Sequence, residues 1–139
     1  MRLPTFRPLI ASVAALTSLT LTAPIPADEQ EFQATLQASR VERGAMRHKL
    51  GTRFTFAASE GYGTIGEFTA DASWYLTSIR IIHSAEVTLT DADGNEISIT
   101  LDEAQLSSDA TFVTGFHIVG GTGVFEGATG LGRSRGLSS

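Results

Sequence analysis

Apolar and polar residues alternate along most of the chain after its first thirty or so residues. Phe32, Ala34 and Leu36, for example, are separated by polar neighbours. Successive side chains of a strand point to opposite faces of a sheet, so this period of two predicts half-buried strands. The alternating stretches are residues 31–37, 52–57, 65–72, 87–90, 97–101 and 111–119, and Ile79, Ile81 and Ile82 form a further β-branched cluster.

Turn residues separate these stretches. Asp91 to Glu96 contains Asp93-Gly94-Asn95 between two alternating runs, which supplies the positive φ that a hairpin turn needs. Residues 61–63, Gly-Tyr-Gly, predict another turn, and Gly115 predicts a bulge within the stretch 111–119. Short strands about ten residues apart with glycine turns indicate an all-β barrel or sandwich.

One stretch allows a helix instead. Over residues 29–50, Phe32, Leu36 and Val41 approximate helical spacing, although Gly44 and the density of charge weaken this alternative. No linker divides the chain after residue 27, so residues 28–139 are interpreted as one domain.

Residues 120–130 read GGTGVFEGATG, with five glycines and only Val124 and Phe125 as large apolar residues. Such a run predicts tight backbone reversals, because glycine adopts positive φ without steric cost. A dinucleotide site is rejected, since it needs a following helix and an acidic residue about 20 positions later. A phosphate-binding P-loop is rejected as well, because no Lys-Ser or Lys-Thr pair follows.

The N-terminus has the pattern of a secretory signal peptide. Arg2 and Arg7 precede an uncharged run from Leu9 to Leu21, and small residues precede Asp28. We expect residues 1–27 to be removed by cleavage after Ala27, with Ala23 as a second choice, and the product to be secreted or periplasmic. The alternative is an uncleaved anchor, but the run is shorter than the roughly 20 apolar residues that span a bilayer. No membrane span is expected after processing.

Composition excludes several classes of chemistry. The chain has no cysteine, which removes disulfides, thiol catalysis and thiolate metal sites. The net charge is −5, and removal of two arginines with the leader makes the remainder more acidic, so nucleic acid is not an expected partner. One basic cluster is interpreted as a solvated loop or, alternatively, as a patch for an anionic partner; it comprises Arg40, Arg43, Arg47, His48, Lys49 and Arg53.

Asp91, Asp93, Asn95 and Asp102 have the spacing of positions 1, 3, 5 and 12 of a calcium loop. Position 6 is Glu96 instead of glycine, and the flanks alternate like strands, so a hairpin turn is the preferred interpretation over weak calcium binding. No metal site and no cofactor are predicted.

Three residues are catalytic candidates. Glu67, His83 or His117 would act as an acid or base if it pointed into a barrel interior, and His117 is expected on the opposite face from Phe116. The alternative for each histidine is a surface or locally hydrogen-bonded side chain. Two interpretations are open for Trp74, Tyr75 and Tyr62: they line a cavity, or they are core and rim aromatics. The sequence does not decide between the two.

The glycine motif Gly120–Gly130 resembles that of the allene oxide cyclase/dirigent-like barrel superfamily, in particular its small exported bacterial members. Residues 63–69 and 87–96 resemble a strand entry and a hairpin of the same family, and the three segments together span most of residues 32–132. The resemblance implies a single antiparallel barrel of about eight strands that can hold one small ligand. The C-terminal residues 131–139 are short and glycine-interrupted, so the closing strand is expected to be short or missing, which would leave an edge open to another chain.

The functional expectation follows from that architecture. Plant members of the superfamily cyclise an unstable fatty-acid epoxide or steer phenoxy-radical coupling, both by confining a reactive molecule in a shaped cavity. No active residue carries over, since the matched motif forms a turn and the cyclase's functional cysteine has no counterpart. We expect a non-catalytic barrel that binds a small hydrophobic molecule in its lumen. The alternatives are a cyclase or isomerase, or a structural protein that self-associates through its open edge.

Overall fold

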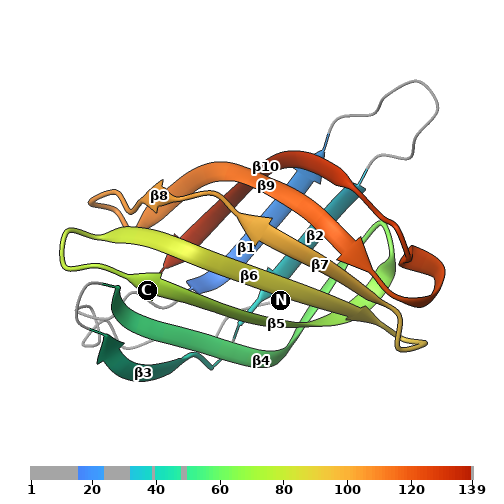
Figure 1. Cartoon of the computed structure of the whole chain (residues 1–139), viewed down its shortest axis with the longest axis horizontal. Helices are drawn as coiled ribbons and strands as arrows, with labels where there is room; N and C mark the ends of the chain where they lie inside the picture. Colours follow the sequence, from blue (N-terminus) through green and yellow to red (C-terminus); the bar gives the residue numbers. More distant parts are fainter. Residues whose placement is uncertain (1–15, 24–31, 39, 48–49, 139) are drawn as a thin grey trace.

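The computed structural model describes residues 16–23, 32–38, 40–47 and 50–138, and this part of the chain contains ten strands and no α-helix. The strands are β1 (Leu16–Ala23), β2 (Phe32–Gln37), β3 (Glu42–Arg47), β4 (Gly51–Gly63), β5 (Gly66–Leu76), β6 (Ile81–Asp91), β7 (Glu96–Leu101), β8 (Ala104–Gln105), β9 (Thr111–Gly121) and β10 (Gly130–Ser138). Figure 1 shows them wrapped around a common interior.

Eight of the strands form a closed antiparallel barrel. Their order is β2-β1-β10-β9-β7-β6-β5-β4, and pairing between β2 and β4 closes the ring. β3 extends the sheet along the first half of β4, and the short β8 pairs with the start of β6. The expected fold class, an all-β barrel of about eight strands, is therefore confirmed.

The alternating stretches form strands where the pattern predicts them, but the structure corrects four details of the sequence prediction. Residues 61–63 are the end of β4 and not a turn, because they pair with both β2 and β5. Ile81, Ile82 and residues 87–90 lie on the continuous strand β6, which begins at Ile81, whereas Ile79 lies in the turn before it. The described part of residues 29–50 forms β2 and β3, so the helical alternative is wrong. The bulge expected at Gly115 lies instead at Val119, where the pairing of β9 with β7 shifts.

The C-terminal residues form a complete strand, which corrects the expectation of a short or missing closure. β10 pairs with β9 on one side and with β1 on the other, and Figure 1 shows the blue β1 between the red β10 and the teal β2. The glycines of β10 do not prevent it from forming a strand, because backbone pairing with β9 and β1 holds both of its edges. β1 lies inside residues 1–27, the segment that the sequence predicts to be a signal peptide.

The glycine motif is a corner between β9 and β10 that is fastened to the β6–β7 turn. Gly123–Phe125 form a 3₁₀ turn, and Gly123 and Gly127 have φ of 59° and 80°. Thr122 and Glu96 are joined by two hydrogen bonds: the Thr122 backbone N–H donates to the Glu96 carbonyl (2.9 Å), and the Glu96 backbone N–H donates to the side-chain oxygen Oγ1 of Thr122 (3.0 Å). The predicted role of this segment as a turn is confirmed.

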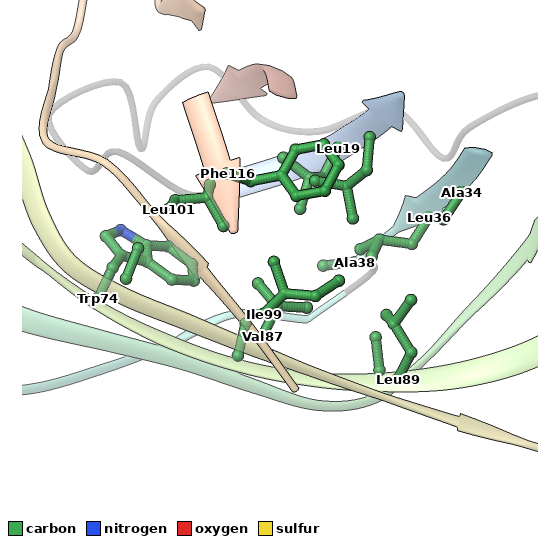
Figure 2. Packing of buried hydrophobic residues seen from close by; sticks show 14 of the residues in the cluster. Leu19, Ala34, Leu36, Ala38, Trp74, Val87, Leu89, Ile99, Leu101 and Phe116 are labelled. Atoms are coloured by element: carbon green, nitrogen blue, oxygen red, sulfur yellow. The ribbon is translucent and has the colours of Figure 1, made fainter. Parts of the chain in front are cut away.

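The interior of the barrel is apolar. Figure 2 shows side chains from opposite walls pointing toward one another, with Leu19, Leu36 and Phe116 on one side and Val87 and Ile99 on the other. Aromatic rings contact each other in two groups, Phe32 with Phe116 at 6.2 Å between centroids and Trp74 with Phe54 and Phe56 at 5.9 Å. Burial of this surface is the main source of stability, since no disulfide is available.

Candidate functional site

A groove opens in the barrel wall where β2 and β4 part. The two strands pair over only three residues, Ala34–Leu36 with Gly61–Gly63. β3 then pairs with β4 from Gly51 to Thr55, so residues 56–60 of β4 have no partner strand on this side among the described residues. The groove beside this unpaired stretch has a volume of about 1110 Å³.

The lining of the groove joins the interior to the surface. Leu36, Ala38 and Phe68 belong to the buried core, and each of them lines the groove. Exposed side chains, including Tyr62 and Glu67, line it from the outer surface. The groove is thus a place where the apolar interior comes close to solvent, and its volume is slightly above the roughly 300–1,000 Å³ of typical small-molecule pockets.

A bulge in β4 shapes this groove. The pairing register of β4 with β5 shifts between Phe56 and Ser59, and Ala58 adopts a φ of 53°. Asp71 on β5 holds the bulge, because its Oδ1 accepts the Ala58 backbone N–H at 2.8 Å. Without the bulge, the alternation that buries Phe54 and Phe56 would direct Glu60 inward. With it, Glu60 and Tyr62 are exposed.

Ser59 is the residue that the bulge turns inward. Its side chain is buried, pairs across to Ala70 and lines the groove. Among the described residues no partner accepts or donates a hydrogen bond to its hydroxyl, although most buried polar groups have one. Sequence reasoning missed Ser59. The available signal was that strict alternation from the buried Phe54 and Phe56 would also bury the acidic Glu60, which indicates a bulge between them.

The rest of the described interior carries no ionisable group. The buried polar residues of the described chain are Thr52, Ser59 and Ser134, and Ser134 Oγ donates to the Thr114 carbonyl at 3.2 Å. Thr52 lies at the other end of β4 and does not line the groove. Ser59 is therefore the interior polar group that a molecule in the groove would meet.

The three catalytic candidates all lie outside the interior and are not brought together. Glu67 is exposed on the outer rim of the groove, opposite Tyr62. His117 is exposed, on the opposite face from the buried Phe116 as predicted, and its Nε2 lies 3.3 Å from Asp102 Oδ1. This exposed contact contributes little to stability.

His83 is held locally on the outside of the barrel. Its ring stacks on Tyr75 with centroids 5.6 Å apart, Nε2 lies 2.8 Å from the Leu50 carbonyl, and Nδ1 lies 3.0 Å from Ser84 Oγ. The Leu50 carbonyl only accepts, so Nε2 carries a proton. The locally hydrogen-bonded alternative describes His83. The aromatic residues divide likewise: Trp74 belongs to the core, Tyr75 contacts His83, and Tyr62 lines the groove.

Of the four residues with calcium-loop spacing, Asp91, Asp93 and Asn95 lie at the β6–β7 hairpin turn, whereas Asp102 lies beyond the end of β7. Asp91 Oδ1 accepts the backbone N–H groups of Asp93 and Asn95, each at 2.9 Å. Desolvation opposes the shift, but hydrogen bonds from Asn95, Asp93 and Gly94 hold the pKa of Asp91 below its ordinary value. Within the described chain no three acidic or histidine side chains are close enough together to hold a metal ion.

Arg43 and Arg47 lie on β3 and Arg53 lies on β4, so these residues of the basic cluster are on strands and not in the loop that the sequence predicts. Residues Glu42–Arg47 form β3, which pairs with β4. Arg40, Arg43 and Arg53 are exposed, and Arg40 Nε lies 4.0 Å from Glu42 Oε2. His48, Lys49 and the side chain of Arg47 lie outside the described residues.

The fold and groove define a closed eight-stranded antiparallel barrel with an apolar interior and an opening in its wall. In comparisons with family models, curated proteins and solved structures, no match to this chain was found. Along the described ranges, no helix is long and apolar enough to cross a membrane.

Proposed function

We propose that this protein is an exported barrel that binds one small, mainly hydrophobic molecule, which reaches the interior through the groove between β2 and β4. The observation that carries the proposal is the meeting of buried Leu36, Ala38 and Phe68 with a groove of about 1110 Å³. Eight-stranded barrels are wide enough either to be filled by side chains or to hold one small ligand.

Small residues that point inward from β2, β4 and β5 support ligand binding against this part of the barrel wall. Ala34 of β2, Ala38 just after β2, Ser59 of β4 and Ala70 of β5 lie beside or near the groove and bring little volume to the interior. Larger aliphatic residues, such as Ile99 of β7, face them from other strands. This distribution favours a ligand seated against β2, β4 and β5.

Ser59 defines the ligand's chemistry further. A buried hydroxyl without a protein partner is satisfied when a bound molecule supplies one. The ligand class is therefore an apolar body that carries one hydroxyl, carbonyl or ether oxygen. Export is part of the same proposal, and the leader-like residues 1–27 support it. The barrel architecture also supports the resemblance to the allene oxide cyclase/dirigent-like superfamily.

Native mass spectrometry of protein purified from its own host tests the proposal directly. We expect a bound compound of low mass, and compounds of the same class should raise the melting temperature in a ligand panel. If no lipid or aromatic compound co-purifies and no panel member shifts the melting temperature, the protein does not have this function.

Ser59→Ala tests the site. Loss of one hydrogen bond should weaken binding of an oxygen-bearing ligand roughly 2- to 12-fold, while an oxygen-free analogue should bind equally well to both proteins. The matched control is Ser73→Ala, because Ser73 lies on the neighbouring strand β5 between the buried Ala72 and Trp74 and faces outward. Equal affinities of both variants for the oxygen-bearing ligand would place the ligand elsewhere.

A further inference from the structure

The space between β10 and β2 is filled by β1, which has two buried leucines, and three of the four residues that pair with these leucines are small. Leu19 pairs with Gly136 of β10 and Leu36 of β2, and Leu21 pairs with Ser134 and Ala34. Both leucines have no exposed surface. Gly136, Ser134 and Ala34 leave room that the leucine side chains occupy, so the seam selects for bulky aliphatic residues two positions apart.

The same strand lies within the segment that the sequence assigns to a signal peptide. Cleavage after Ala27 would separate β1 from the rest of the barrel. It would leave β10 and β2 with unpaired backbone groups facing each other, which is a template for an added strand. It would also uncover the contact between Phe32 and Phe116, two buried rings of the core.

We propose that the β10–β2 seam is a strand-acceptor site for an extended segment of another polypeptide in which two bulky aliphatic residues alternate with serine or threonine. β1, Leu16–Ala23, is the occupant supplied by the chain itself and shows the chemistry that the seam accepts. Opening of the seam in the exported protein rests on processing after Ala27, and the proposal is independent of ligand binding in the groove.

The register explains why the site is selective. A partner strand runs antiparallel to both β10 and β2, as β1 does. A slip of one residue would direct its polar residues into the core and its leucines to the outside. A charged residue at the Leu19 or Leu21 position would be buried beside aliphatic groups without a partner, which is strongly unfavourable.

Strand exchange in the full chain tests the proposal. A protease recognition sequence is placed within residues 24–31, which join β1 to β2, and the folded protein is cut there. A fluorescent peptide of residues 16–23 is then added in excess, and its uptake is followed by anisotropy and native mass spectrometry. We expect the cut protein to exchange its N-terminal piece for the peptide, and the uncut protein to resist, because a tethered strand has a high effective concentration.

The control peptide carries Leu19→Asp and Leu21→Asp and should bind at least about tenfold more weakly, since the cost of burying a charge exceeds 1.4 kcal/mol. Using variant peptides leaves the folding of the protein itself unchanged. Equal uptake of both peptides, or uptake of neither by the cut protein, would overturn the proposal. Formation of dimers in place of peptide complexes would overturn it too, because a second copy would then be the occupant. Failure of this assay leaves the Ser59→Ala result unaffected, so the two proposals are distinguishable.

Discussion

Single residues decide how the turns of this barrel are built, and Gly121 is the clearest case. A Cβ at this position would lie 2.5 Å from the Phe125 carbonyl oxygen and 2.7 Å from the Glu96 carbonyl oxygen. Both neighbours are backbone atoms of the corner and of the adjoining hairpin, so they cannot move aside independently. Glycine is required here by close approach and not by φ.

Gly121→Ala should therefore lower the free energy of unfolding by about 1–3 kcal/mol, as overpacking does. The adjacent Gly120→Ala is a matched control, because nothing lies within 4 Å of a Cβ there. Its effect should stay within about 0.5 kcal/mol. Urea unfolding of the two variants measures the difference, and equal stabilities would contradict the proposed corner packing.

Asp91 gives a residue-scale prediction for pH. Hydrogen bonds from Asn95, Asp93 and Gly94 outweigh desolvation and lower the pKa of Asp91 in the folded state. Its stabilisation is therefore complete above the unfolded pKa of about 3.9 and is lost as pH falls through the lower folded value. Asp91→Asn keeps an acceptor oxygen but removes the charge.

We expect the melting temperature of Asp91→Asn to approach that of the wild type as the pH falls from 6 to 3, because the wild type alone loses this contribution. Glu126→Gln, an exposed change of the same charge, is the control. Calorimetric scans across this range check the prediction. A gap between wild type and Asp91→Asn that stays constant with pH would contradict it.

At the scale of elements, the bulge of β4 sets which side chains face the interior. Ala58 holds a left-handed conformation, with a φ of 53°, and Asp71 accepts its backbone N–H. That conformation costs a non-glycine residue about 1–2 kcal/mol. The strain is retained because the bulge keeps Glu60 outside and turns Ser59 inward.

Ala58→Gly should relieve this strain and leave the protein equally stable or up to about 1 kcal/mol more stable, after the entropy cost of glycine. Ala57→Gly, one residue earlier and without positive φ, should destabilise by about 0.5–1 kcal/mol. Chemical denaturation compares the two. If Ala58→Gly is as destabilising as Ala57→Gly, the bulge does not hold Ala58 at positive φ.

At the scale of the whole molecule, closure of the barrel depends on β1. Its pairing with β10 and β2 joins the two ends of the described chain, and Leu21 is fully buried between them. Removal of a fully buried leucine side chain destabilises by about 2–5 kcal/mol. An unpacked N-terminal segment would show no such effect.

In the full-length chain, Leu21→Ala should therefore lower the free energy of unfolding by that amount. Thr20→Ala on the same strand is the control and should have a much smaller effect, because Thr20 is only half-buried. Thermal and urea unfolding provide the measurement. Indistinguishable variants would show that the barrel of the intact chain is not closed by β1.

The sequence alone determined the local features of this protein. Alternation of side chains is a property of neighbouring residues, so it identified the main strands and placed Phe116 and His117 on opposite faces. Glycine permits positive φ at its own position, a local property that identified the corner at residues 120–130 and the Asp-Gly-Asn hairpin at residues 91–96.

Tertiary structure decided what depends on residues far apart in the chain. β10 is a full strand because β9 and β1 pair with both of its edges, although its own glycines predict a weak one. Ser59 faces inward because Asp71, on the next strand, stabilises a bulge in β4. After this bulge, the odd-numbered residues of β4 face the interior instead of the even-numbered ones. The groove exists because β2 and β3 share one edge of β4 and leave a gap between them, and no local pattern of side chains encodes that division.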